Sequence, residues 1–226
     1  MRITDHLAEI RARMNRAAAG AGRQAGDITL VAVSKGHPVA AVQLGLAAGL
    51  QNLGENYVQE ALPKIAAVNR DAVWHFIGRI QSNKTREIAE SFAWAQTVTS
   101  ARIAERLSAQ RPHYGPPLQV CIQLQPGAGD VARDGCPRVD VAALADVIAG
   151  LPRLKLRGLM LLPHAGLDAD GLRVEYRAAL AAQDQLNARG HALDTLSMGM
   201  SDDFELAIEE GSTMIRIGTA LFGKRT

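Results

Sequence analysis

The sequence predicts a protein of the α/β class that folds as a closed barrel of eight parallel strands. Along the 226 residues, eight short apolar segments recur, and a stretch of helical periodicity follows each of them. Eight strand–helix units are the number that closes such a barrel, and barrels of this kind form one domain at this length. We therefore expect a single (β/α)8 TIM barrel over residues 1–226, preceded by one extra N-terminal helix.

The extra helix is expected over about residues 4–19. Apolar side chains recur there at helical spacing, and Thr4 is a plausible N-cap. Because such a helix needs an apolar surface to cover, it should pack on the barrel. The expected strands span residues 28–33, about 50–53, 73–77, 93–98, 118–124, 154–161, 193–197 and 213–217.

Between and after the strands, helices are expected. Their ranges are 38–48, 56–68, 83–90, 101–110, 139–149, 171–188 and 202–210. Asn83, Asp140 and Ser201 lie near helix starts, where side-chain oxygens accept from free backbone amides. Pro63 predicts either a kink in the helix over 56–68 or two shorter helices.

An open, doubly wound sheet is the alternative architecture. It predicts a glycine-rich G-x-G-x-x-G turn after the first strand, where a dinucleotide phosphate would bind. That turn here reads Ser34-Lys35-Gly36-His37-Pro38, which does not match. The barrel is therefore favoured.

Composition excludes several classes of protein. The net charge is +2 with no basic run, so nucleic acid is not the expected partner. The two cysteines, Cys121 and Cys136, have no metal-binding spacing and indicate a reducing compartment. No signal sequence or membrane-spanning apolar stretch is recognisable, so we expect a soluble cytoplasmic protein.

Lys35 is the most informative residue. It follows the apolar run 28–33, at the carboxyl end of the first expected strand. A lysine there either extends to solvent or is partly desolvated, and desolvation lowers the pKa of an amine and makes it nucleophilic. The polar residues at other strand ends favour the second interpretation.

The ends of the seventh and eighth strands predict a phosphate site, because the loops that follow them hold phosphate in many barrels. Ser201 is expected to open a helix, whose free N–H groups favour an anion. Gly218 and Thr219 offer a close backbone approach and a hydroxyl group. Taken singly, Ser201 could be an ordinary N-cap and Gly218 an ordinary turn residue.

Three further residues have two interpretations each. Arg216, within an apolar strand, needs either a ligand or an ion pair with Glu205, Glu209 or Glu210. Asn56 either contacts a ligand or caps the following helix. His75 is either a hydrogen-bonded core histidine or a ligand-facing side chain. Lys35 with a phosphate site fits two chemistries: a Schiff base with a sugar phosphate, as in lysine (class I) aldolases, or one with pyridoxal 5'-phosphate (PLP).

At these residues the chain resembles the pyridoxal phosphate homeostasis protein family. The matching segments are residues 30–35, 54–60, 74–78, 81–84, 156–160, 196–201 and 210–219. The resemblance implies a barrel like the N-terminal domain of alanine racemase. It also implies that Lys35 forms the Schiff base with PLP and that Arg216 faces the pyridine nitrogen. Further, it implies that Ser201, Gly218 and Thr219 hold the phosphate, while Asn56 and Met200 line the pocket.

The chain departs from the family pattern at Gly36-His37, at Arg79 and at Arg133, and the last change puts a role for a loop lysine in doubt. Racemization needs acid–base groups on both faces of the cofactor. The racemases' second base, a tyrosine, comes from a C-terminal domain, and no such domain is expected after the eighth strand. We therefore hypothesise a carrier that buffers PLP and delivers it to apo-enzymes, with little or no catalysis, and we expect it to be a monomer. A low-activity racemase is the alternative.

Overall fold

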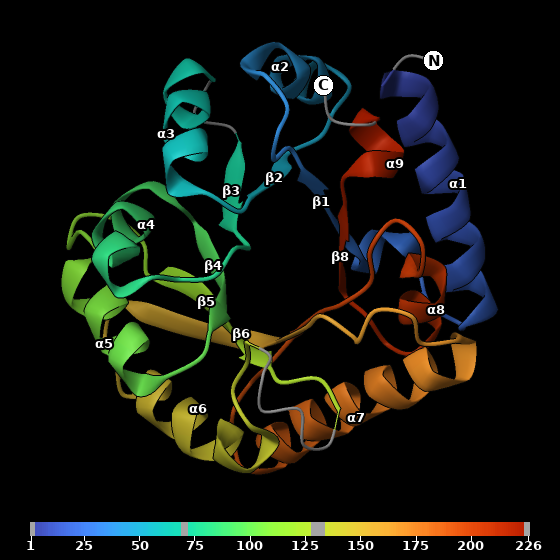
Figure 1. The fold of residues 1–226 in the computed structure, drawn as a ribbon. Helices are drawn as coiled ribbons and strands as arrows, with labels where there is room; N and C mark the ends of the chain where they lie inside the picture. The colour runs from blue at the N-terminus through green and yellow to red at the C-terminus, as the bar shows by residue number, and fades with distance from the viewer. Residues whose placement is uncertain (1–2, 69–71, 128–133, 224–226) are drawn as a thin grey trace.

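A computed structural model describes residues 3–68, 72–127 and 134–223, and it confirms the predicted barrel (Figure 1). Its eight strands pair in sequence order, every pair is parallel, and β1 pairs with both β2 and β8, which closes the sheet. The strands are β1 (Thr29–Val33), β2 (Asn52–Glu55), β3 (Val73–Phe76), β4 (Trp94–Val98), β5 (Leu118–Leu124), β6 (Leu154–Leu161), β7 (Thr195–Ser197) and β8 (Met214–Ile217).

Helices surround the barrel, and their apolar faces pack on the outward side chains of the strands (Figure 1). The α-helices are α1 (Ile3–Gly20), α2 (Val39–Ala47), α3 (Val58–Ala67), α4 (Thr85–Ser91), α5 (Ala101–Gln110), α6 (Val141–Ala149), α7 (Ala169–Ala188), α8 (Phe204–Glu209) and α9 (Thr219–Phe222). The short helix α9 was not predicted. Within the described residues, no helix is long and apolar enough to span a membrane.

The second strand begins two residues later than predicted, at Asn52 instead of about residue 50. Leu50 belongs to the end of α2, because its amide donates to the Gly45 carbonyl at 3.0 Å. Gly49, with φ of 89°, makes the turn that this helix ending requires. Leu50 is therefore buried, with its amide bound by the helix end and not by a neighbouring strand.

The predicted helix starts need correction. Ser201 does not open a helix, because α8 begins at Phe204 after a turn over 201–203. The Asp203 carboxylate accepts from the Met200 amide at 2.5 Å, which stabilises that turn. Neither Asn83 nor Asp140 caps a helix with its side chain, and each lies in a 3-10 turn before α4 or α6. Helix α3 is continuous through Pro63.

The N-terminal helix packs on the barrel as predicted, and Figure 1 shows α1 beside α8 and α9. The Arg13 guanidinium donates to both carboxylate oxygens of Glu205, at 2.7 and 2.6 Å, and lies 4.5 Å from the ring centre of Phe204. His6 Nδ1 contacts the Leu221 carbonyl at 2.9 Å. These contacts join α1 to the helices that follow β7 and β8.

Candidate functional site

A cavity of about 360 Å³ lies at the carboxyl ends of the strands. Val33, Ile77, Met160 and Leu162 form apolar parts of its wall. All the residues predicted to bind a ligand line this one cavity: Lys35, Asn56, Met200, Ser201, Arg216, Gly218 and Thr219. The structure therefore brings together side chains from β1 to β8 that are up to 184 positions apart in the sequence (219 − 35).

Lys35 lies in the turn that follows β1 and is half-buried. Gly36, with φ of 75°, reverses the chain there, and the His37 amide donates to the Ser34 carbonyl at 3.1 Å. A positive φ is strained for most other residues, so the glycine that departs from the family pattern suits this turn. His37 also lines the cavity.

Ser34 and Gly36, on either side of Lys35, contact an ion cluster behind the cavity. The Lys64 ammonium donates to the Ser34 carbonyl at 2.8 Å, and to Glu55 and Glu60 at 2.7 Å each. The Ser34 hydroxyl donates to Glu55 at 2.6 Å, and the Gly36 amide donates to Glu60. Burial raises the pKa of the Glu55 carboxyl, although the hydrogen bonds from Lys64 and Ser34 oppose that shift.

Arg216 is buried, and its partners differ from the ion pair considered from the sequence. It donates to the Ser197 hydroxyl at 2.7 Å and to the Leu161 carbonyl at 2.9 Å. The three candidate glutamates contact arginines of α1 and α7 instead: Glu205 binds Arg13, Glu209 binds Arg173, and Glu210 binds Arg173 and Arg177. Burial lowers the pKa of Arg216 to about 10, so the guanidinium remains protonated at neutral pH.

A chain of hydrogen bonds continues from Arg216 through the barrel interior. The Ser197 hydroxyl donates to Gln96 Oε1 at 2.7 Å, and Gln96 Nε2 lies 2.9 Å from His75 Nδ1. His75 Nε2 lies 3.0 Å from Asn52 Oδ1. With Gln96 donating to Nδ1, His75 carries its proton on Nε2, so every donor points away from the cavity.

His75 is thus the hydrogen-bonded core histidine of the two interpretations. Its side chain is completely buried and stacks on Trp94, with ring centres 5.2 Å apart. It does not line the cavity at the carboxyl ends. Burial lowers the pKa of His75 to about 3, so the imidazole is neutral at physiological pH.

The predicted phosphate residues lie at one edge of the cavity. The Ala220 amide lies 3.5 Å from Ser201 Oγ, which links the turn after β7 to the start of α9. A Cβ atom placed on Gly218 would lie 3.4 Å from the Val33 side chain, and the φ of Gly218 is −114°. Neither a positive φ nor crowding in this structure requires glycine there.

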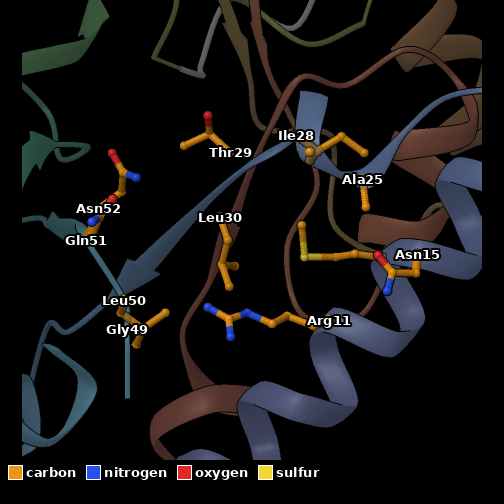
Figure 2. Close-up of a pocket in the computed structure, with 12 residues that line it drawn as sticks. Arg11, Asn15, Ala25, Ile28, Thr29, Leu30, Gly49, Leu50, Gln51 and Asn52 are labelled. Carbon is orange, nitrogen blue, oxygen red and sulfur yellow. The ribbon is translucent and has the colours of Figure 1, made fainter. Parts of the chain in front are cut away.

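A second cavity of about 390 Å³ lies at the amino ends of β1 and β2 (Figure 2). Arg11 and Asn15 of α1 reach its rim, and Asn52, the last residue of the hydrogen-bond chain, lies in its wall. Arg11 is the one ionisable side chain among its lining residues in the described structure. The cluster of reactive groups is therefore at the opposite, carboxyl end of the barrel.

Comparisons with known proteins agree with this arrangement. Residues 6–226 match the family described as "Alanine racemase, N-terminal domain". The "Pyridoxal phosphate homeostasis protein" of Pseudomonas aeruginosa is 49% identical over 225 residues, which cover 99% of this chain and 96% of that one. The protein of the same name from Escherichia coli K12 is 44% identical over 227 residues, covering 99% and 97%.

Among solved structures, PipY of Synechococcus elongatus with PLP bound superposes with a TM-score of 0.86. It is 35% identical, and the match covers 98% of this chain and 100% of PipY. The barrel and the family match place the chain in the class of alanine racemase N-terminal domains. Within that class, it belongs to the pyridoxal phosphate homeostasis protein family.

Of the three departures from the family pattern, Arg133 lies outside the described residues. Arg79 is exposed and pairs with Asp134 at 3.3 Å. Sequence reasoning missed the roles of Ser197 and Lys64. Lys64 did leave a signal, since it occupies the buried face of α3 with Val58 and Ala61, where a charge is unexpected.

Proposed function

We propose that this chain binds PLP in the 360 Å³ cavity and acts in intracellular PLP homeostasis, buffering the cofactor and delivering it to apo-enzymes. The observation that supports this most is the gathering of Lys35, Arg216 and the residues 201, 218 and 219 around one cavity. A cavity of this volume is in the range that holds a small organic cofactor.

The residues present fit PLP. The Asn56 side-chain oxygen is buried and has no hydrogen-bond partner among the described residues, so a ligand in the cavity could supply one. Arg216 presents a fixed positive charge, and Ser201 and Thr219 provide hydroxyl groups for a phosphate. Met160 and Leu162 offer apolar surface for a ring.

When bound, PLP supplies an aldehyde that condenses with amines. Lys35 is the residue that would offer its amine nitrogen to that aldehyde, and the condensation would release water without any oxidant or reductant. Ser201, Gly218 and Thr219 would hold the phosphate, while Asn56 and Met200 would lie around the ring. Arg216 would be the residue beside the pyridine nitrogen, and its charge would disfavour protonation there, which would weaken the electron sink that catalysis needs.

The proposed role is that of a carrier with little or no catalysis. Racemization needs acid–base groups on both faces of the ring, and in the racemases one of them is a tyrosine. Among the described residues no tyrosine lines the cavity: Tyr57 and Tyr114 are exposed, and Tyr176 is buried in the core. The names of the relatives, homeostasis proteins, support the same role.

The test is the visible absorbance of the purified protein with PLP, before and after borohydride. We expect a yellow wild type that borohydride bleaches and traps on Lys35, a pale Lys35→Ala variant, and a yellow Lys155→Ala control, since Lys155 is exposed at the start of β6. A protein that PLP cannot colour, but that borohydride traps with a sugar phosphate, would instead be a class I aldolase.

Two further assays separate a carrier from an enzyme. PLP-loaded protein should reactivate a PLP-dependent apo-enzyme, whereas alanine racemization should stay at background. Robust racemization that Lys35→Ala abolishes would establish the racemase alternative.

We also propose that residues 1–226 act as one monomeric PLP-binding unit, which sedimentation of the loaded protein would test.

A further inference from the structure

The proposed pocket makes no use of a buried cation that lies behind it. Lys64 is on α3, its side chain is 4% exposed, and it does not line the cavity. Burying an ammonium is costly unless its donors are all satisfied. Lys64 therefore needs a structural or functional reason to be where it is.

The ammonium group is fully satisfied, and its three acceptors come from three parts of the fold. They are the Ser34 carbonyl after β1, the Glu55 carboxylate at the end of β2, and the Glu60 carboxylate one turn earlier on α3. Because an ammonium has three N–H donors, these contacts of 2.7 to 2.8 Å fix its position. Lys64 thus ties α3 to the ends of two neighbouring strands.

The same cluster holds the backbone on both sides of Lys35. Before it, Ser34 contacts the cluster twice, through its carbonyl to Lys64 and its hydroxyl to Glu55. After it, the Gly36 amide donates to the Glu60 oxygen that also accepts from Lys64. The residue between these anchors is the one whose amine must reach the ligand, so its backbone has little freedom to rotate.

We propose that Lys64 is a positioning residue for Lys35: through Ser34, Glu55 and Glu60 it holds the turn 34–36 so that the Lys35 amine is aimed into the cavity. This inference rests on the proposed function. Residues that do not touch the ligand can raise a reaction rate by holding the reacting group in the correct position. The cluster should therefore govern the covalent step and not the non-covalent binding of the phosphate and ring.

The experiment compares two probes on the full chain. PLP can condense with Lys35, whereas pyridoxine 5'-phosphate carries an alcohol in place of the aldehyde and cannot. In Lys64→Met, we expect wild-type affinity for pyridoxine 5'-phosphate within about twofold. Condensation with PLP, measured by stopped-flow absorbance, should become about tenfold slower or more. The pH dependence of the condensation rate should also change. Lys155→Met is the matched control and should behave like the wild type.

A second variant guards against failure to fold, since breaking a buried ion pair is often destabilising. Glu60 is half-buried, and Glu60→Ala removes the acceptor of the Gly36 amide, so it should slow condensation in the same selective way. If the folded variants lost affinity for pyridoxine 5'-phosphate as much as they lost condensation with PLP, the cluster would have only a structural role. If they condensed with PLP at the wild-type rate, the cluster would not position Lys35. Either result overturns the inference. A wild type that binds pyridoxine 5'-phosphate but never condenses with PLP would instead overturn the proposed function.

Discussion

Arg216 on β8 and Ser197 on β7 are joined by a hydrogen bond of 2.7 Å inside the barrel. Ser197 is completely buried, and Arg216 is 4% exposed. The Ser197 hydroxyl in turn donates to Gln96 Oε1 at 2.7 Å, so neutral side chains and not a carboxylate hold the guanidinium at this contact. A positive charge therefore faces the cavity without a neutralising partner among these contacts.

Ser197→Ala removes this acceptor and should weaken PLP binding. A buried hydrogen bond to a charged group contributes about 1.5–3 kcal/mol, which corresponds to roughly 10- to 100-fold in affinity. Titration of PLP by absorbance measures the effect. Ser212→Ala is the matched control: Ser212 is also completely buried, but its hydroxyl donates to a backbone carbonyl, with the Met198 oxygen at 2.7 Å. Unchanged affinity in Ser197→Ala would show that Arg216 does not depend on this contact.

His75 should make the protein sensitive to mild acid. Its pKa is about 3 in the fold, because burial disfavours the charged form, against 6.5 in the unfolded chain. Below pH 6.5 the unfolded state binds a proton at His75 that the folded state does not bind. The free energy of unfolding therefore keeps its full value above pH 6.5 and decreases as the pH falls towards 3. The loss is about 1.4 kcal/mol for each pH unit.

Urea unfolding of the wild type and His75→Gln at pH 7 and pH 5 tests this. The variant starts from a different stability, so the comparison is the change between the two pH values, which should be about 2 kcal/mol smaller in the variant. His113→Gln serves as the exposed substitution control. Equal changes in the wild type and His75→Gln would contradict the assignment of a neutral, buried imidazole.

Gly218→Ala should affect phosphate binding and not folding. The added Cβ meets the Val33 side chain at 3.4 Å, an ordinary contact, so stability should stay within about 0.5 kcal/mol. Because the methyl group reduces the space of the phosphate site, PLP and pyridoxine 5'-phosphate should bind about tenfold more weakly, a loss of about 1.4 kcal/mol. Pyridoxal, which lacks the phosphate, should bind as it does to the wild type.

Gly158→Ala is the contrasting variant, because its Cβ would lie 1.6 Å from the Thr195 carbonyl oxygen and would force β6 and β7 apart. We expect it to lose about 3 kcal/mol of stability. Thermal unfolding and calorimetric binding measure both variants. If Gly218→Ala bound all three ligands equally well, the phosphate would have to lie elsewhere.

The periodicity of the sequence predicted the strands and helices well, because those patterns depend on which side chains each segment must bury. The sequence also predicted which residues lie at the ends of the strands. Lys35, Arg216, Gly218 and Thr219 were expected at the carboxyl end of the barrel, and they line one cavity there. The strand starts and helix caps were less accurate, as Leu50 and Ser201 show, because one or two local hydrogen bonds decide them.

By itself, then, the sequence determined the barrel and the end at which its chemistry lies, since both follow from local patterns and from the parallel order of the strands. Only the tertiary structure decided the partners. Arg216 contacts Ser197, 19 positions away, and Ser197 contacts Gln96, 101 positions away. The register between strands fixes such pairs, and a lysine on the buried face of α3 meets its three acceptors only once two strand ends are brought beside that helix.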